Sequence, residues 1–126
     1  MFTSLMPHLY AADVDRTVAF YRDLLGFIES FRYPSDGPAE HVEVRVGDVV
    51  LGISAQDAVR AIEGLPEPTP GHPMELTVWC DSVDEAVARL RDAGVPVLVE
   101  PYDHPARHRR AYVTDPDGNW VALVGK

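Results

Sequence analysis

The chain has 126 residues, of which 46% are hydrophobic and 25% charged, as in a single soluble globular domain. A net charge of −9 argues against a nucleic-acid partner or an anionic membrane surface, because both require a basic patch. Cys80 is the only cysteine, so no intrachain disulfide can form. The N-terminal residues lack a signal-peptide pattern, and no apolar run approaches the ~20 residues of a membrane span. We therefore expect a cytoplasmic protein with no membrane partner.

The first half of the chain predicts one helix and four strands. Asp13 is the N-cap, because its carboxylate can accept from the free amides of the first helical turn, and Gly26 ends the helix in a left-handed conformation. Gly47 and Asp48 predict a hairpin turn between two strands. The element order is therefore β-α-β-β-β, with strands expected at residues 5–12, 27–33, 41–46 and 49–53.

The middle of the chain separates this unit from a second one. Residues 56–63 favour a short helix, and residues 64–73 hold four prolines and two glycines, too many for a regular element. We therefore divide the single domain, residues 1–126, into unit one at 1–55, a linker at 56–73 and unit two at 74–126.

The second unit predicts the same order of elements. Ser82 and Glu85 form a capping box at the start of its helix, and Gly94 ends that helix. Residues 101–108 are expected to form a loop. The strands are expected at residues 74–80, 95–99, 110–114 and 119–124.

The two helical segments are nearly the same sequence. With a shift of 69 positions, six residues of the segment that begins at Val14 coincide with six of the segment that begins at Val83. After one deletion, Gly26 meets Gly94. A capped helix used twice with the same ending indicates duplication of one structural unit.

Two such units, joined by a proline-rich linker, resemble the vicinal oxygen chelate superfamily, which includes glyoxalase I, extradiol dioxygenases and bleomycin-resistance proteins. The motifs that carry the resemblance lie at residues 13–15, 20–27, 83–84, 90–95 and 115–119. The resemblance implies an α+β fold in which two tandem βαβββ units form a curved mixed sheet, a cup, with the helices outside. It also implies pairing as a homodimer.

The resemblance places four metal-ligand positions in the cup, and this chain departs from the pattern at three of them. Only Glu75 offers an oxygen ligand, and His8 lies about 6.6 Å along the strand from the first position, too far to replace it. We therefore expect no metal and no cofactor, which disfavours a metal-dependent glyoxalase or dioxygenase. The four positions are Met6, Gly52 (with Leu51 as a close alternative), Glu75 and Ala122.

Strand alternation predicts which side chains line the cup. Two further contacts, Tyr102 and His108, come from the loop that borders the cup mouth in the family. Aromatic walls with few polar groups suit a flat or extended organic ligand. The predicted ligand-binding residues are Met6, His8, Tyr10, Arg45, Gly52, Glu75, Thr77, Trp79, Tyr102, His108, Tyr112, Trp120 and Ala122.

We therefore expect a binding protein that sequesters a hydrophobic or aromatic natural product without a metal, giving antibiotic self-resistance. Bleomycin-resistance proteins do this, and Pro7, Leu9 and Asp13 resemble the opening strand of that branch. The alternative is a metal-free isomerase, cyclase or lyase of the same fold, with Glu75 or His8 as the proton carrier.

Overall fold

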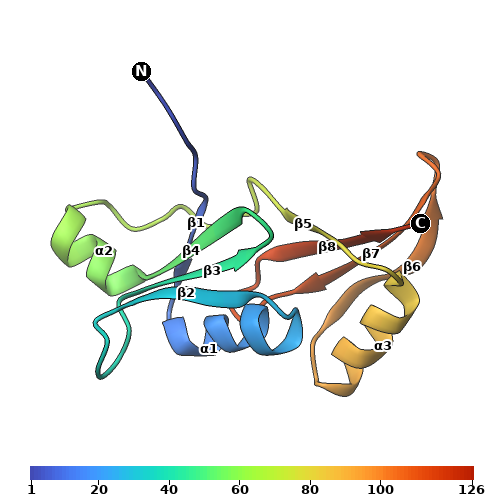
Figure 1. Cartoon of the computed structure of the whole chain (residues 1–126), viewed down its shortest axis with the longest axis horizontal. Helices are drawn as coiled ribbons and strands as arrows, with labels where there is room; N and C mark the ends of the chain where they lie inside the picture. The colour runs from blue at the N-terminus through green and yellow to red at the C-terminus, as the bar shows by residue number, and fades with distance from the viewer. The chain divides into compact units, whose positions relative to one another are not determined.

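A computed structural model describes residues 1–126 as two compact units, Met1–Thr69 and Pro70–Lys126, so the division falls inside the predicted linker. Figure 1 labels the helices and strands of both units. Unit 1 contains β1 (His8–Ala11), α1 (Val14–Ala19), a π-helical turn η1 (Phe20–Leu24), β2 (Ile28–Tyr33), β3 (His41–Val46), β4 (Val49–Ala55) and α2 (Gln56–Glu63). Unit 2 contains β5 (Leu76–Trp79), α3 (Val83–Asp92), β6 (Val97–His104), β7 (His108–Thr114) and β8 (Trp120–Gly125).

Each unit holds a four-stranded mixed sheet with the same topology. The strand orders are β1-β4-β3-β2 and β5-β8-β7-β6. In both sheets the first strand of the unit pairs in parallel with the last, and the remaining pairs are antiparallel. This confirms the predicted α+β fold of two tandem βαβββ units. None of the helices combines the length and hydrophobicity of a membrane-spanning segment.

The predicted helix signals act as expected in both units. The Asp13 carboxylate accepts from the Arg16 amide at 3.2 Å, and the Ser82 hydroxyl accepts from the Glu85 amide at 3.3 Å. Gly26 and Gly94 have φ values of 81° and 84°, where a side chain would be strained. The duplicated segment therefore forms a capped helix in each unit, continuous in unit 2 and ending in the π-helical turn η1 in unit 1.

One face of each sheet is covered by the unit's own helix. α1 packs on β3 and β4, and α3 packs on β6, β7 and β8 (Figure 1). Alternate side chains of the strands therefore face the helix, and their neighbours face the other side, which we call the open face of the unit. On β4 and β8 residues of both faces are buried. The buried set is Leu9, Ala11, Val42, Val44, Leu51 and Ile53 in unit 1, with Ala111, Val113, Val121 and Leu123 in unit 2.

Several strand boundaries differ from the sequence expectations. β1 starts at His8 and β5 at Leu76, so residues 5–7 and Glu75 precede the strands to which they were assigned. The expected loop at 101–108 is wrong, because β6 continues to His104 and β7 begins at His108. Pro101 and register shifts between Val97 and Tyr102 hide this strand, since they break the alternation by which strands are recognised.

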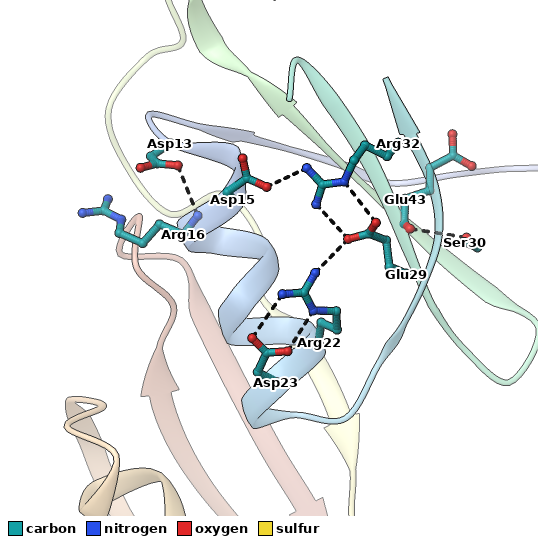
Figure 2. Close-up of polar contacts among 9 residues, drawn as sticks. All are labelled: Asp13, Asp15, Arg16, Arg22, Asp23, Glu29, Ser30, Arg32 and Glu43. Atoms are coloured by element: carbon teal, nitrogen blue, oxygen red, sulfur yellow. Dashed lines mark hydrogen bonds and ion pairs between the residues drawn. The ribbon is translucent and has the colours of Figure 1, made fainter. Parts of the chain in front are cut away.

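A network of ion pairs joins β2 to the helix of unit 1. β2 is an edge strand, and its helix-facing positions carry Glu29 and Arg32 (Figure 2). Arg32 donates to both Glu29 carboxylate oxygens, at 3.0 and 2.8 Å, and to Asp15 at 2.7 Å. Arg22 donates to Glu29 at 2.9 Å and also pairs with Asp23. The hydrogen bonds from Arg32, followed by those from Arg22, hold the pKa of Glu29 below its usual value.

Glu29→Gln is expected to lower the free energy of unfolding by about 1–2 kcal/mol at pH 7, because two guanidinium groups lose their shared carboxylate. A lowered pKa in the folded state means that Glu29 stabilises the fold above the unfolded-state pKa of about 4.3. That contribution disappears as the pH falls through the folded-state pKa, so wild type and variant should converge at low pH. Urea unfolding at pH 7 and pH 3 measures both effects.

The matched control is Glu67→Gln, at an exposed position of the linker, which should leave stability unchanged. A loss that is equal for both variants, or a Glu29→Gln loss that is the same at both pH values, would contradict the assigned role of the network.

Candidate functional site

The open face of unit 1 carries a chain of hydrogen-bonded polar side chains. The β3–β4 register places His41 opposite Ser54 and Glu43 opposite Gly52. His41 Nδ1 lies 2.8 Å from Ser54 Oγ, and His41 Nε2 lies 2.9 Å from Glu43 Oε2. Ser54 is only 6% exposed, whereas the His41 and Glu43 side chains are about a quarter exposed.

The bond to Glu43 determines the tautomer of neutral His41. An ionised carboxylate only accepts, so the proton of neutral His41 lies on Nε2 and Nδ1 is left as an acceptor. The hydroxyl of Ser54 then donates its single proton to His41 Nδ1. The arrangement is that of a hydroxyl group, a base and a carboxylate that orients the base.

His8 joins this chain from β1. Its Nδ1 lies 3.5 Å from Ser54 Oγ, and its ring stacks on His41 with centroids 5.2 Å apart. The ring occupies the space above Gly52, where a Cβ atom would come within 3.0 Å of it. The absence of a side chain at Gly52 therefore lets His8 lie against the sheet beside Ser54.

A pocket of about 560 Å³ opens above these hydrogen-bonded side chains and lies entirely within unit 1. Its floor is formed by the open face of the sheet, and one wall is formed by the apolar side of α2. The lining residues are His8, Tyr10, Tyr33, Glu40, His41, Ser54, Ala58, Val59, Ile62, Glu63 and Leu65.

The open face of unit 2 is aromatic and basic. Trp120 stacks on His72 with ring centroids 4.3 Å apart, and His72 Nε2 donates to the Gly118 carbonyl at 3.0 Å. Arg110 Nη1 donates to the Tyr112 hydroxyl at 3.1 Å. Trp79 remains 70% exposed on β5, so this face offers flat surfaces for contact.

A histidine pair extends this face along the β6–β7 hairpin. His104 and His108 stack with ring centroids 4.5 Å apart, and the Ala106 amide donates to His104 Nδ1 at 3.0 Å. Burial, followed by the charges of His108 and Arg110, lowers the pKa of His104. His108 Nε2 and Arg110 Nε are buried without a hydrogen-bond partner.

The only thiol of the chain, that of Cys80, lies outside both open faces' polar clusters. Cys80 follows β5, and burial, with a smaller effect of Asp81, raises the pKa of its thiol. The thiolate fraction at neutral pH is therefore lower than for a free cysteine.

The structure brings only two of the predicted ligand-binding residues, His8 and Tyr10, into the unit 1 pocket. Arg45 donates to the Gly47 carbonyl at the hairpin, and Met6 lies half-buried before β1. Glu75 is exposed ahead of β5, so it does not face an enclosed apolar cup within its unit. Ala122 is fully buried. The remaining predicted residues, Thr77, Trp79, Tyr102, His108, Tyr112 and Trp120, lie in unit 2.

Sequence reasoning missed several lining residues of the pocket. Strand alternation turns His41 toward the open face, but its role appears only when the register sets it opposite Ser54. Ser54 was missed because the strand was expected to end at residue 53. The contribution of α2 was missed because this helix was assigned to the linker, although Ala58, Val59 and Ile62 recur at helical spacing.

The profile of the Glyoxalase/Bleomycin resistance protein/Dioxygenase superfamily matches residues 3–123. The chain belongs to this superfamily. No curated protein sequence matches it.

Solved structures share the fold of this superfamily member over nearly its whole length. It is similar to a lactoylglutathione lyase from Agrobacterium tumefaciens, with 27% identity, a TM-score of 0.72, and 98% and 92% of the two chains covered. TioX from Micromonospora sp. ML1 is 23% identical, with a TM-score of 0.77 and 98% of each chain covered. A hypothetical protein from S. aureus is 21% identical, with a TM-score of 0.82 and coverage of 100% and 95%.

In this protein, the residues at the metal-ligand positions of metal-dependent superfamily members do not form a site for an ion. Gly52 has no side chain and lies beneath the His8 ring, and Ala122 is a buried methyl group. No group of three His, Cys, Asp or Glu side chains is arranged to hold a metal ion. Neither unit therefore supplies the donor set that a divalent cation needs.

Gly52→Ala and Gly125→Ala form a matched pair of tests. Alanine at 52 meets the His8 ring at 3.0 Å, and this side chain can rotate away, whereas alanine at 125 meets the Cys80 backbone carbonyl at 2.8 Å. We expect Gly125→Ala to lose about 2 kcal/mol of stability and Gly52→Ala to lose under about 1 kcal/mol.

Thermal unfolding and NMR of the histidine side chains measure both outcomes. Gly52→Ala should shift the His8 resonances, and Gly125→Ala should leave them in place. Unchanged His8 resonances in Gly52→Ala would contradict the described position of the ring.

Proposed function

We propose that this protein binds a hydrophobic or aromatic small molecule in the unit 1 pocket, without a metal ion or cofactor. The observation that supports this is the lining of the pocket. The rings of His8, Tyr10, Tyr33 and His41 face the apolar side of α2 around about 560 Å³. A pocket of this size and composition is typical of sites for drug-sized organic ligands.

The charge of the lining favours a neutral or cationic ligand. Glu40 and Glu63 line the pocket, and no lysine or arginine does. A cationic group over the faces of Tyr10 or Tyr33 would gain cation–π stabilisation. We propose that the ligand is a natural product of antibiotic type, and that the protein confers self-resistance by sequestering it in the cytoplasm.

Titration with proflavine, a planar cationic dye, tests the pocket. We expect saturable binding that Tyr10→Ala weakens about thirtyfold, because the ring is 40% exposed in the free chain and truncating an aromatic anchor that a ligand covers costs about 2 kcal/mol. Phe2→Ala, at a fully exposed position, is the control and should bind like wild type. An anionic naphthalene sulfonate should bind more weakly than proflavine. Equal binding by Tyr10→Ala and wild type would exclude the pocket as the site.

The same titration tests the open face of unit 2. If its aromatic surface contributes to binding, the ligand quenches tryptophan fluorescence, and Trp120→Ala weakens binding more than His104→Ala, by about thirtyfold against fivefold. Equal affinities of these two variants would restrict the site to unit 1.

A metal-free isomerase, cyclase or lyase is the second candidate function. It is favoured by the position of His8, which lines the pocket beside Ser54, whereas Glu75 lies exposed in unit 2. Of the two proton carriers considered, we therefore propose His8. Recovery of an unchanged ligand after incubation supports sequestration. A ligand that wild type alters, and that the His8→Gln variant leaves intact, supports the enzyme.

We also propose that two copies pair as a homodimer. β2 exposes apolar side chains on the open face of unit 1, and Ile28, Phe31 and Tyr33 are each at least half exposed in the single chain. Such a row favours burial against a partner. Sedimentation at micromolar concentration should give a dimer that Phe31→Glu shifts to monomer and that Phe2→Glu leaves unchanged. A monomeric wild type would refute the pairing.

A further inference from the structure

We propose that Ser54 is a nucleophile, activated by His41 and Glu43, and that the unit 1 pocket cleaves an aryl ester by acyl transfer. This inference rests on the proposed binding pocket and names a class of substrate for it. The supporting observation is that a hydroxyl, an imidazole and a carboxylate lie in hydrogen-bonded sequence at the floor of that pocket.

The geometry of the three groups meets the requirements of nucleophilic catalysis. Both hydrogen-bond distances, 2.8 and 2.9 Å, are within the range at which a base takes a proton and an acid orients that base. Ser54 lies under the pocket and is 6% exposed, so a ligand that enters the pocket shields its hydroxyl from bulk water. In contrast, Ser30 on β2 donates its hydroxyl to a backbone carbonyl, that of Glu43, at 3.3 Å (Figure 2).

The first half of the reaction transfers the acyl group to Ser54. The oxygen Oγ attacks the ester carbonyl carbon, the carbonyl electron pair moves to its oxygen, and the Oγ proton passes to His41 Nδ1. Glu43 stabilises the resulting imidazolium through Nε2. The carbonyl then reforms, the C–O bond to the aryl group breaks, and His41 returns the proton to the leaving aryl oxide.

The second half regenerates the serine. Water attacks the acyl-Ser54 ester and loses a proton to His41 Nδ1, and collapse of the intermediate releases the acid and returns the proton to Oγ. The net reaction is ester plus water giving acid plus phenol.

His8 supplies the donor for the developing oxyanion. His8 Nδ1 lies 3.5 Å from Ser54 Oγ, and because Ser54 gives its only proton to His41, His8 acts here as a donor in the tautomer that carries its proton on Nδ1. A carbonyl that approaches Oγ brings its own oxygen within reach of the same N–H. Preorganised donors at this position stabilise tetrahedral intermediates.

Labelling with a fluorophosphonate tests the nucleophile directly. We expect a single covalent adduct on the peptide that contains Ser54, and hydrolysis of 2-naphthyl acetate at a rate above that of buffer. Ser54→Ala should abolish both. Ser30→Ala, the matched control on the same sheet, should behave like wild type.

Glu43→Gln distinguishes a catalytic role of the Ser54–His41–Glu43 hydrogen bonds from a purely structural role. Glutamine is uncharged, so whichever of its amide atoms faces Nε2, it stabilises the imidazolium that forms on His41 less than glutamate does. We expect labelling to slow about a hundredfold or more, with proflavine affinity unchanged. Equal labelling rates of Glu43→Gln and wild type would overturn the inference.

Ser54→Cys keeps the test decisive if Ser54→Ala fails to fold. The introduced thiol, paired with His41, should react with iodoacetamide at least tenfold faster than Cys80, whose raised pKa makes it the internal reference. A slower reaction than that of Cys80 would count against activation by His41.

The outcomes distinguish this inference from the proposed function. Proflavine binding without fluorophosphonate labelling would leave the binding protein in place and overturn the acyl transfer. Labelling of Ser54 without proflavine binding would support the nucleophile and reject the aromatic pocket.

Discussion

The antiparallel register between β3 and β4 is the constraint on which the candidate site depends. It sets His41 opposite Ser54 and Glu43 opposite Gly52, while Val42 and Val44, which alternate with them along β3, are buried under α1. A shift of the β3–β4 register by one residue would turn the valines to the open face and the polar side chains toward the core. The burial of the apolar residues therefore fixes the alignment of the polar ones, without any interaction at the site being required.

Duplication gave both units the same scaffold but different chemistry. The β7–β8 register sets Arg110 opposite Val124, where unit 1 has the pair His41 and Ser54. It sets Tyr112 opposite Ala122, where unit 1 has the pair Glu43 and Gly52. The valine at position 124 has no hydroxyl group, so unit 2 cannot form the chain of unit 1. Arg110 instead donates to the hydroxyl of Tyr112, and its guanidinium lies 6.0 Å from the centre of that ring. The two open faces therefore differ in the chemistry that they offer to a ligand.

The sequence predicted the fold because the signals were local. Asp13, Ser82, Gly26 and Gly94 define the helices through bonds within a few residues, and the repeat relates the two units. The site was predicted only in part, because it depends on pairs far apart in the chain, such as His8 with Ser54. The ends of strands were the weakest inference. Glu75 seemed significant because it was assigned to a strand that begins one residue later.

The irregular edge strand β6 has a consequence for how copies of this chain can associate. β6 is the last strand of its sheet, and an exposed edge with free amides is a template for another strand. Pro101 has no N–H to offer, and the register shifts on either side of Val99 bend the row of remaining groups. This edge is therefore a poor template for extension of the sheet by a second copy.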